Sequence, residues 1–390
     1  MGIRTAFVST YPPRRCGIAM FTRDLAVATG PHEIVALQPA DQAEPYPLDV
    51  HHLIRRDVDT DYARVARLLR DCAVDVVSVQ HEYGIWGGDD GARVLDFVRA
   101  VDQPVVATLH TVLRRPSASQ HRILSQLVRA SAVSVVMSQV AAALLRDVYD
   151  VDPSRIEVVP HGVPELDLVD SRTVKPALGL AGRMVLLSFG LLGPGKGYEL
   201  AIEAMPAIVR SVPDVCYVVL GATHPDLLRG EGEAYRQKLM ARTAALGMAD
   251  HVRFVDRFVS PRELGRWLQA ADVFVTPYPN LDQIVSGTLS YAMGAGRAVV
   301  STPYAYATEL LSDGRGLLVG GGSPDALADA VACLLQDPVR RAALGRRAHA
   351  YTRPMLWRAV GAAYERLFAR VAGTRPFDAR TSASMSAIRA

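Results

Sequence analysis

Short runs of β-branched and apolar residues alternate with longer helical patterns along the whole chain, and this alternation starts afresh near residue 184. Strand, helix and strand in repeated succession form a parallel sheet with helices on both faces. At 390 residues, the chain has room for two domains of ordinary size. The sequence therefore predicts an α/β protein with two doubly wound, Rossmann-like domains that face each other across a cleft.

The predicted elements set the domain boundaries. The predicted strands are residues 4–9, 32–37, 74–80, 104–109, 132–138 and 156–159, then 184–189, 215–221, 252–255, 273–276, 298–301 and 316–319. The predicted helices are residues 18–29, 62–72, 91–100 and 118–129, then 198–211, 234–246, 261–270, 288–294, 324–336, 338–350 and 355–371. We expect domains at 1–165 and 176–352, joined by a proline-containing linker at 164–176. A helical segment at 353–372 and a disordered tail at 373–390 follow.

Charge and composition exclude several classes of protein. The 43 Lys and Arg side chains nearly balance 40 Asp and Glu, and without a basic stripe this argues against nucleic-acid binding. The four cysteines form no CxxC pair, which favours reduced thiols in a cytoplasmic protein. The sequence has neither a signal peptide nor an apolar run long enough for a transmembrane helix. The basic stretch 113–129 is interpreted as a solvated helix, with weak peripheral membrane contact or a phosphorylated acceptor as the alternative.

Polar residues follow the strands of the first domain, where open α/β sheets bind their ligands. Gly17 opens a helix after the first strand, either as a structural turn or as a place where backbone N–H groups reach an anion. His81, Glu82 and Tyr83 precede several glycines, and such a polar, aromatic loop suits a hydroxyl-rich ligand. His110 follows an apolar strand, from which its neutral imidazole could bond a substrate hydroxyl.

The second domain carries two candidate phosphate loops. Gly195 and Lys196 lie in a glycine-rich turn that opens a helix, although its spacing is not that of a Walker motif. The chain has three lysines; for Lys175 in the linker and Lys238 on a helix we expect no role beyond solubility. After the strand 273–276, Asp282 can accept hydroxyl hydrogen bonds, and the segment 286–288 can hold phosphate at a helix start or act only as an N-cap.

These segments together resemble the retaining glycosyltransferases of the GT-B fold, most closely family 4, from about residue 3 to residue 371. Gly17 matches the family's glycine loop over the donor phosphates, and His110 matches its histidine near the donor sugar. The family motifs "PNGV", "GRLxxEKG", "DVFVxP" and "EAMAxGxPVV" resemble residues 159–163, 190–197, 272–277 and 292–300. Trp357 and the helix after it resemble the family's C-terminal helix, which crosses back to the first domain.

This chain departs from the family pattern at the leaving-group site. His161 replaces the asparagine of "PNGV", and Leu191 replaces the arginine of "GRL". The two glutamates of the family's E-x7-E motif, which hold the donor sugar and the ribose, fall on Gln283 and Tyr291. Asp282, beside Gln283, is the candidate to take over the first role. The resemblance implies that Lys196, with the segment Ser286-Gly287-Thr288, binds the donor phosphate.

The leading hypothesis is a retaining hexosyltransferase that moves a sugar from a nucleotide-diphosphate sugar to a carbohydrate or glycoconjugate hydroxyl. His110, Asp282 and Lys196 would carry the chemistry, and His81, Glu82 and Tyr83 would bind the acceptor. We expect no cofactor and no metal, because the loops hold no Asp-x-Asp motif or ligand cluster. The first alternative is a GT-B glycoside phosphorylase that uses phosphate or a sugar 1-phosphate, which fits Leu191 and Tyr291. A non-catalytic sugar-phosphate-binding protein is a third reading.

Overall fold

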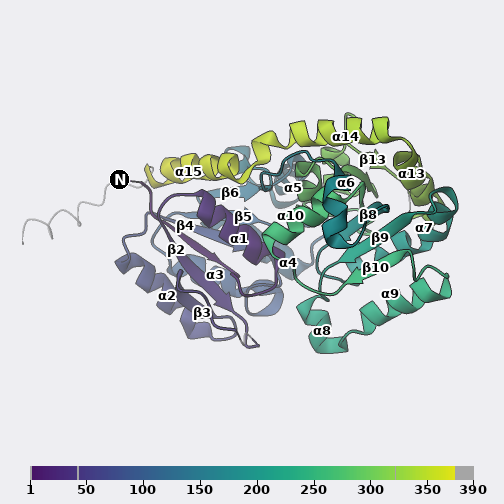
Figure 1. The fold of residues 1–390 in the computed structure, drawn as a ribbon. Coiled ribbons are helices and arrows are strands. Elements are labelled where there is room, and N and C mark those ends of the chain that lie inside the picture. Colours follow the sequence, from purple (N-terminus) through teal and green to yellow (C-terminus); the bar gives the residue numbers. More distant parts are fainter. Residues whose placement is uncertain (1, 42–43, 321, 374–390) are drawn as a thin grey trace, which may run out of the picture.

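The computed structural model describes residues 2–41, 44–320 and 322–373, and it confirms two doubly wound α/β domains (Figure 1). All adjacent strands pair in parallel. The first sheet has seven strands in the order β3-β2-β1-β4-β5-β6-β7, and the second has six in the order β10-β9-β8-β11-β12-β13. Parallel strands that are buried on both faces explain the continuous apolar runs of the sequence.

The first domain contains β1 to β7 and α1 to α5. Its strands are β1 Thr5–Ser9, β2 His32–Gln38, β3 Val50–Arg55, β4 Val76–His81, β5 Val105–Leu109, β6 Val133–Val136 and β7 Ile156–Val158. Its helices are α1 Gly17–Ala28, α2 Asp59–Asp71, α3 Arg93–Ala100, α4 Ala118–Ala130 and α5 Gln139–Tyr149. The sequence prediction missed β3 and α5. β3 is a partly exposed edge strand, and α5 begins after Ser138, which the prediction placed inside a strand.

The second domain contains β8 to β13 and α7 to α14. Its strands are β8 Met184–Phe189, β9 Val215–Leu220, β10 Val252–Val255, β11 Val273–Thr276, β12 Ala298–Ser301 and β13 Leu317–Leu318. Its helices are α7 Tyr198–Ser211, α8 Pro225–Glu231, α9 Ala234–Ala245, α10 Pro261–Ala270, α11 Gly287–Gly294, α12 Ala305–Leu310, α13 Pro324–Gln336 and α14 Pro338–Tyr351. The prediction missed α8 and α12, which are too short to show a helical period.

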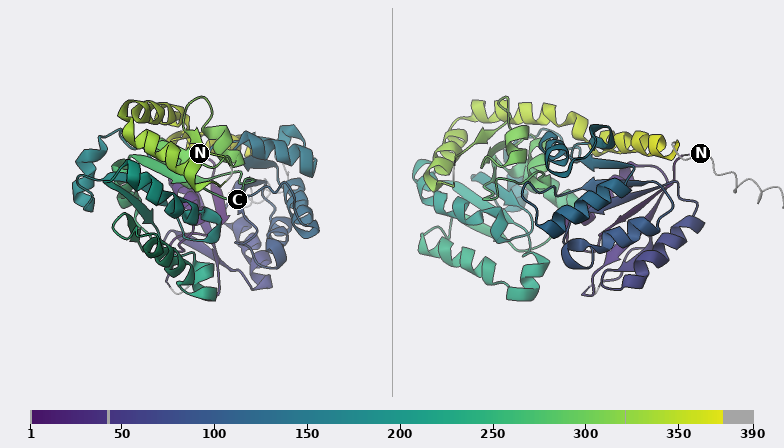
Figure 2. Two further views of the ribbon diagram at one scale, coloured as in Figure 1. Left: turned by 90° about the vertical axis from the view of Figure 1, so that its right-hand side faces the viewer. Right: turned by 180° about the vertical axis from the view of Figure 1, so that it is seen from behind.

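The last helix, α15 (Trp357–Gly373), lies on the first domain, while α14 lies over the second (Figure 1 and Figure 2). Tyr364 and Phe368 of α15 are buried beside Phe7 of β1, and the Tyr364 hydroxyl lies 3.0 Å from Thr108 Oγ1. A side chain at Gly361 would collide with the Ala28 carbonyl oxygen, so a glycine permits the close approach of α15 to α1. Of the predicted tail 373–390, Gly373 ends this helix and the rest lies outside the described residues.

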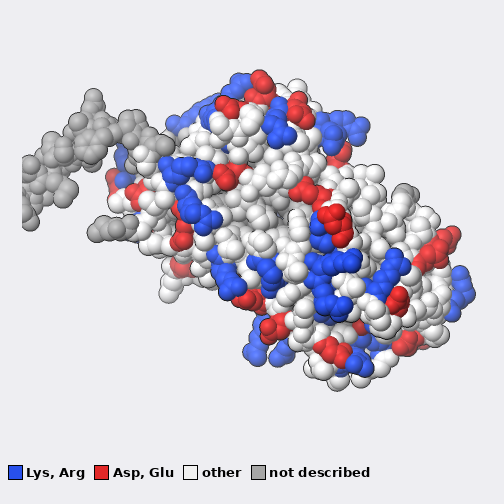
Figure 3. Space-filling model, turned by 90° about the horizontal axis from the view of Figure 1, so that it is seen from above, with Lys and Arg blue, Asp and Glu red and all other residues white. Residues whose placement is uncertain are grey.

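Charged side chains of both signs are interspersed over the face that α14 and α15 form (Figure 3). That face shows no broad patch of a single sign. In the described part of the chain, no helix combines the length and the hydropathy that crossing a bilayer requires.

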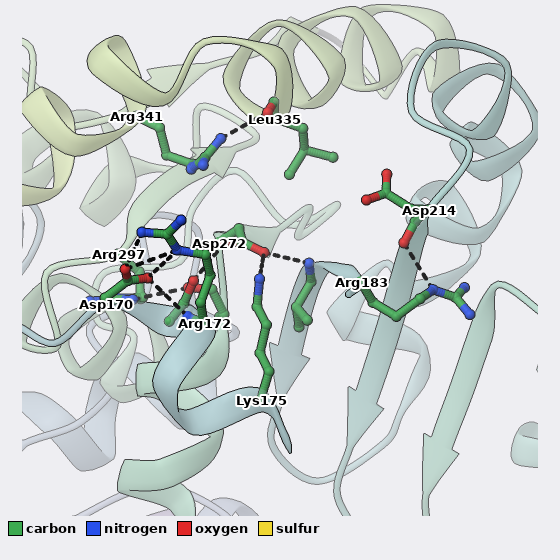
Figure 4. Close-up of polar contacts among 12 residues, drawn as sticks. Asp170, Arg172, Lys175, Arg183, Asp214, Asp272, Arg297, Leu335 and Arg341 are labelled. Carbon is green, nitrogen blue, oxygen red and sulfur yellow. Dashed lines mark hydrogen bonds and ion pairs between the residues drawn. The ribbon is translucent and has the colours of Figure 1, made fainter. Parts of the chain in front are cut away.

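The interpretation of Lys175 as a solubilising linker residue is wrong. The segment 164–176 includes α6 (Ser171–Val174), and the Lys175 side chain after it is 4% exposed. Its Nζ lies 2.6 Å from Asp272 Oδ2, just before β11 (Figure 4). Asp272 also accepts hydrogen bonds from the backbone N–H of Val185 and from the Ser171 hydroxyl. This buried ion pair therefore fixes the linker to the core of the second sheet.

Replacing Lys175 with alanine should destabilise the second domain by about 3–5 kcal/mol, because the Asp272 carboxylate would stay buried without its cation. Denaturant unfolding at pH 7 measures the change. Lys238→Ala, at an exposed lysine of α9, is the matched control and should change the free energy of unfolding by less than about 0.5 kcal/mol. Equal effects of the two substitutions would contradict the structural role of the buried pair.

Candidate functional site

Each sheet has a switch point, which lies between two neighbouring central strands whose following connections run to opposite sides of the sheet. In the first sheet it lies between β1 and β4, and in the second between β8 and β11. In open α/β sheets, ligands bind beyond the carboxyl ends of the strands at such points. The predicted residues follow these strands or, with His110, the neighbouring β5. The structure thus places most of them at the two switch points.

The segment 190–197 between β8 and α7, which we call the lysine loop, packs against the segment that follows β11. Gly197 has φ +67°, and a Cβ there would lie only 2.0 Å from the Pro277 carbonyl oxygen, so the contact requires glycine. Lys196 Nζ lies 4.6 Å from the centre of the Tyr278 ring, a cation–π contact. Within the residues that the structure describes, no carboxylate pairs with Lys196. Its charge is therefore available to an anion.

The start of α11 adjoins this lysine. Ser286 is the N-cap, since its hydroxyl accepts a hydrogen bond from the backbone N–H of Leu289. Its Oγ lies 3.1 Å from Thr288 Oγ1, which lies 2.8 Å from the Tyr278 hydroxyl oxygen. Lys196, Tyr278, Ser286 and Thr288 thus form one connected group, which we call the donor cluster. Gly195 is exposed, with open space where a side chain would be.

Two neutral imidazoles lie between α1 and α11. His110 Nε2 is 2.9 Å from Gln80 Oε1, so Nε2–H donates and Nδ1 carries no proton. Burial lowers the pKa of His110 to about 3, and the imidazoles of His161 and His81 act in the same direction. His161 lies beside the start of α11, and burial lowers its pKa to about 4. The edge of Phe21 in α1 contacts both rings.

In the predicted acceptor loop, the His81 side chain has no hydrogen-bond partner among the described residues, whereas the Glu82 carboxylate has its hydrogen bonds within the protein. His81 is fully buried, and neither of its ring nitrogens has a hydrogen-bond partner among the described residues. Burial lowers the pKa of His81 to about 4, and Tyr83 contacts its ring edge-on. The Glu82 carboxylate instead accepts from the Tyr83 backbone N–H and the Thr111 hydroxyl, and burial raises its pKa. The Tyr83 hydroxyl donates to the Gln120 carbonyl at 3.4 Å, so His81 is the predicted acceptor residue whose side chain has no partner among the described residues.

Asp282 faces the first domain in this structure. Its carboxylate pairs with Arg114 at 3.2 Å and with Arg115 at 3.5 Å, both from the loop before α4. Both arginines lie before the helix and are exposed, so they are solvated as predicted, and their ion pairs with Asp282 join the two domains at the surface. The side-chain amide of the neighbouring Gln283 donates to the Val285 carbonyl, 2.8 Å away. The roles of Asp282 and Gln283 toward a donor sugar remain predictions.

Helix α1 contributes more to the site than the sequence predicted. Gly17 is its exposed first residue, and Asp24 accepts a hydrogen bond from the Tyr291 hydroxyl of α11 at 3.2 Å. Tyr291, predicted to hold a ribose, thus joins α11 to the first domain. Sequence reasoning missed Phe21 and Asp24, although the spacing of Gly17, Phe21 and Asp24 places all three on one face of a helix.

Comparison with known proteins matches both halves of the chain to glycosyltransferase families. Residues 183–337 match the model of glycosyl transferases group 1, and residues 23–165 match that of Glycosyltransferase Family 4. A D-inositol 3-phosphate glycosyltransferase of Xylanimonas cellulosilytica is 32% identical over 297 residues, which cover 70% of this chain and 68% of the relative. A GDP-mannose-dependent alpha-(1-6)-phosphatidylinositol monomannoside mannosyltransferase of Mycolicibacterium smegmatis is 34% identical over 43% of this chain and 42% of its own length.

Solved structures show the same fold at low sequence identity. The Anabaena protein HepE, solved in complex with UDP and glucose, superposes with a TM-score of 0.77 at 17% identity and covers 94% of this chain and 100% of that one. Sucrose-phosphate synthase from Thermosynechococcus elongatus has a TM-score of 0.75 at 16% identity, with 96% and 100% coverage. The predicted GT-B fold is therefore confirmed.

The buried histidines predict a loss of stability in mild acid. An unfolded histidine has a pKa near 6.5, whereas His81 and His110 titrate well below that value in the folded chain. As the pH falls from 6.5 to 5, the unfolded state therefore binds protons that the folded state does not. Each of these two residues should cost about 2 kcal/mol of the free energy of unfolding over this range.

Denaturant unfolding between pH 7 and 5 measures this loss. His81→Asn should reduce the pH-dependent loss by about 2 kcal/mol, whatever its effect at pH 7. An unchanged pH dependence in that variant would show that His81 takes up its proton over the same pH range in the folded and unfolded states, and it would contradict the lowered pKa.

Proposed function

Because the chain belongs to the group 1 and family 4 glycosyltransferases, we propose that it moves a glycosyl group from a nucleoside-diphosphate sugar to a hydroxyl acceptor with retention of anomeric configuration. The observation that carries the proposal is the donor cluster at the switch point of the second sheet. There, Lys196 lies beside the start of α11 and has no anionic partner among the described residues. A helix start and a free lysine together suit a diphosphate. HepE was solved with UDP in the same fold.

The leaving diphosphate is the group that these residues serve. As the glycosidic bond breaks, negative charge grows on the leaving phosphate oxygen. The Lys196 ammonium and the backbone N–H groups at the start of α11 stabilise that charge, and Thr288 offers a hydroxyl. A fixed arrangement of this kind lowers the barrier because it needs no reorganisation during the reaction.

The first domain supplies uncharged hydrogen-bonding groups. The His110 imidazole, held by Gln80, accepts a hydrogen bond from a hydroxyl of the donor sugar through Nδ1. The unpartnered nitrogens of His81 bind the acceptor hydroxyl. Their low pKa values keep both rings neutral at pH 7, so they orient hydroxyls without repelling the glycosyl cation that develops. Attack occurs on the face that the diphosphate leaves, and a leaving-phosphate oxygen takes the acceptor proton, as the family resemblance implies.

The first test is a screen of unfolding midpoints against UDP, GDP, ADP and dTDP, with phosphate and hexose 1-phosphates in parallel. One nucleoside diphosphate at 100 times its Kd should raise the midpoint by about 5 °C or more, since binding to the folded state alone adds about 2.7 kcal/mol. A response to phosphate and hexose 1-phosphates alone would favour a glycoside phosphorylase instead. Binding of a phosphate compound without turnover on any acceptor would favour a non-catalytic protein.

Replacing Lys196 with alanine should lower kcat/KM for the responding donor by about 100-fold or more, since one cation at the developing charge is worth about 2–4 kcal/mol. Lys196→Arg should also lose most activity, because a planar guanidinium does not place its charge at the point that the compact ammonium occupies. Initial rates of nucleotide release measure both, with Lys238→Ala as the control. Near-normal turnover of Lys196→Arg would refute the requirement for an ammonium group.

We expect transfer to be independent of divalent metal, since the Lys196 ammonium and the backbone N–H groups at the start of α11 stabilise the charge of the diphosphate. Initial rates in about 5 mM EDTA, which is a large excess over trace metal, should stay within about twofold of the initial rates without EDTA. NMR of the product should show the anomeric configuration of the donor. Loss of activity in EDTA with recovery on adding Mg²⁺ or Mn²⁺ would contradict metal independence, and an inverted anomeric centre would contradict retention.

A further inference from the structure

The leaving-group site has one cation fewer in the lysine loop than the family pattern provides. Where the family has an arginine, this chain has Leu191, and Lys196 is the loop's single basic residue. A nucleoside diphosphate carries at least two negative charges, so one ammonium leaves part of that charge without a cationic partner. A second cation would have to come from another segment of the chain.

Arg14, in the loop between β1 and α1, is such a cation. It is partly buried, and its Nη1 is fully shielded from solvent without a hydrogen-bond partner. Across the ranges that the structure describes, no carboxylate pairs with its guanidinium. The next residue, Arg15, is 57% exposed and lies 3.9 Å from Glu44. A shielded guanidinium N–H without an acceptor costs free energy, and an anion in the site would remove that cost.

Contacts between the domains place Arg14 near the lysine loop. The Leu192 carbonyl of that loop accepts a hydrogen bond from the backbone N–H of His224, 2.9 Å away. His224 caps α8, and Arg229 of α8 pairs with Asp41 in the segment after β2 of the first domain. Glu44, close to Asp41 in the chain, lies 3.9 Å from Arg15, the residue next to Arg14. Helix α8 thus links the lysine loop to the segment of the first domain that contacts the β1–α1 loop.

The electrostatics of His224 agree with this placement. Burial lowers its pKa, Asp226 opposes the change, and the positive charges of Lys196, Arg14 and Arg229 lower it further. Lys196 and Arg14 therefore both lie within electrostatic reach of one imidazole, although they belong to different domains. Arg229 is paired with carboxylates, whereas Lys196 and Arg14 pair with none in the part of the chain that the structure describes.

We propose that Arg14 is a donor-binding residue, whose guanidinium holds the diphosphate from the first domain and takes the place of the arginine that the family has at Leu191. The inference rests on the proposed function, since it assumes a diphosphate in the donor cluster. Lys196 and Arg14 would then bind this group from opposite sides of the domain boundary. The planar fork of an arginine suits phosphate oxygens, and the charge of the ligand would satisfy the shielded Nη1.

Isothermal titration of the full chain with UDP, GDP, ADP and dTDP tests this role, and Arg15→Ala is the matched control. Arg14→Ala should weaken the nucleoside diphosphate that the wild type binds by about tenfold or more, because a hydrogen bond to a charged group is lost. Arg15→Ala should stay within about twofold of the wild type. Adding Leu191→Arg to Arg14→Ala should restore most of the affinity.

Each contrary result of these titrations overturns a different part of the proposal. Wild-type protein that binds none of the four diphosphates would overturn the proposed function. Wild-type binding with unchanged affinity in Arg14→Ala would overturn the role of Arg14 alone. Failure of Leu191→Arg to restore affinity would overturn the equivalence to the family's arginine. Without ligand, Arg14→Ala should keep the wild-type unfolding midpoint, and a fall of more than about 5 °C would identify Arg14 as a structural residue instead.

Discussion

The contact of the segment 282–284 with the first domain fixes how the two switch points face each other. Ile284, although it follows β11 of the second sheet, is buried in the hydrophobic core of the first domain. The Ser138 hydroxyl donates a hydrogen bond to the Ile284 carbonyl, and Asp282 pairs with Arg114 and Arg115. On α12, the Glu309 carboxylate accepts from the first backbone N–H groups of α5. The loops at the carboxyl ends of both sheets therefore meet, and the donor cluster lies beside α1.

This arrangement separates charged from neutral groups. The second domain and the β1–α1 loop contribute two cations, Lys196 and Arg14, that have no carboxylate partner within the described ranges. The ends of β4 and β5 contribute neutral imidazoles. A diphosphate and a sugar require such a division, because one carries negative charge and the other only hydroxyls. The hydrogen bond from Tyr291 to Asp24 links α11 to α1 between these two regions.

The sequence predicted the central strands of the second sheet well. β8, β11 and β12 have the predicted bounds, because buried parallel strands are continuous apolar runs. The edge strand β10, which is only partly buried, also has its predicted bounds. β3 was missed because an edge strand with two histidines shows no such run. Lys175 was misread because nothing in its local sequence reveals Asp272, which lies 97 residues away and is its buried partner.

The positions of the candidate residues in the fold were predictable where they follow from the end of a strand. Lys196, His81, His110 and Ser286 follow central strands or open helices, so their place at the carboxyl edge could be derived from the pattern alone. The pairing of Asp282 with Arg114 depends on how the two domains meet. No pattern within one domain contains that information.

A crystal structure of the protein with its preferred nucleoside diphosphate tests the central claim most directly. The account predicts the diphosphate at the start of α11, with Lys196 Nζ and a guanidinium nitrogen of Arg14 each within about 3.2 Å of a phosphate oxygen. A nucleotide bound away from the donor cluster, or a diphosphate there that neither cation touches, would contradict it.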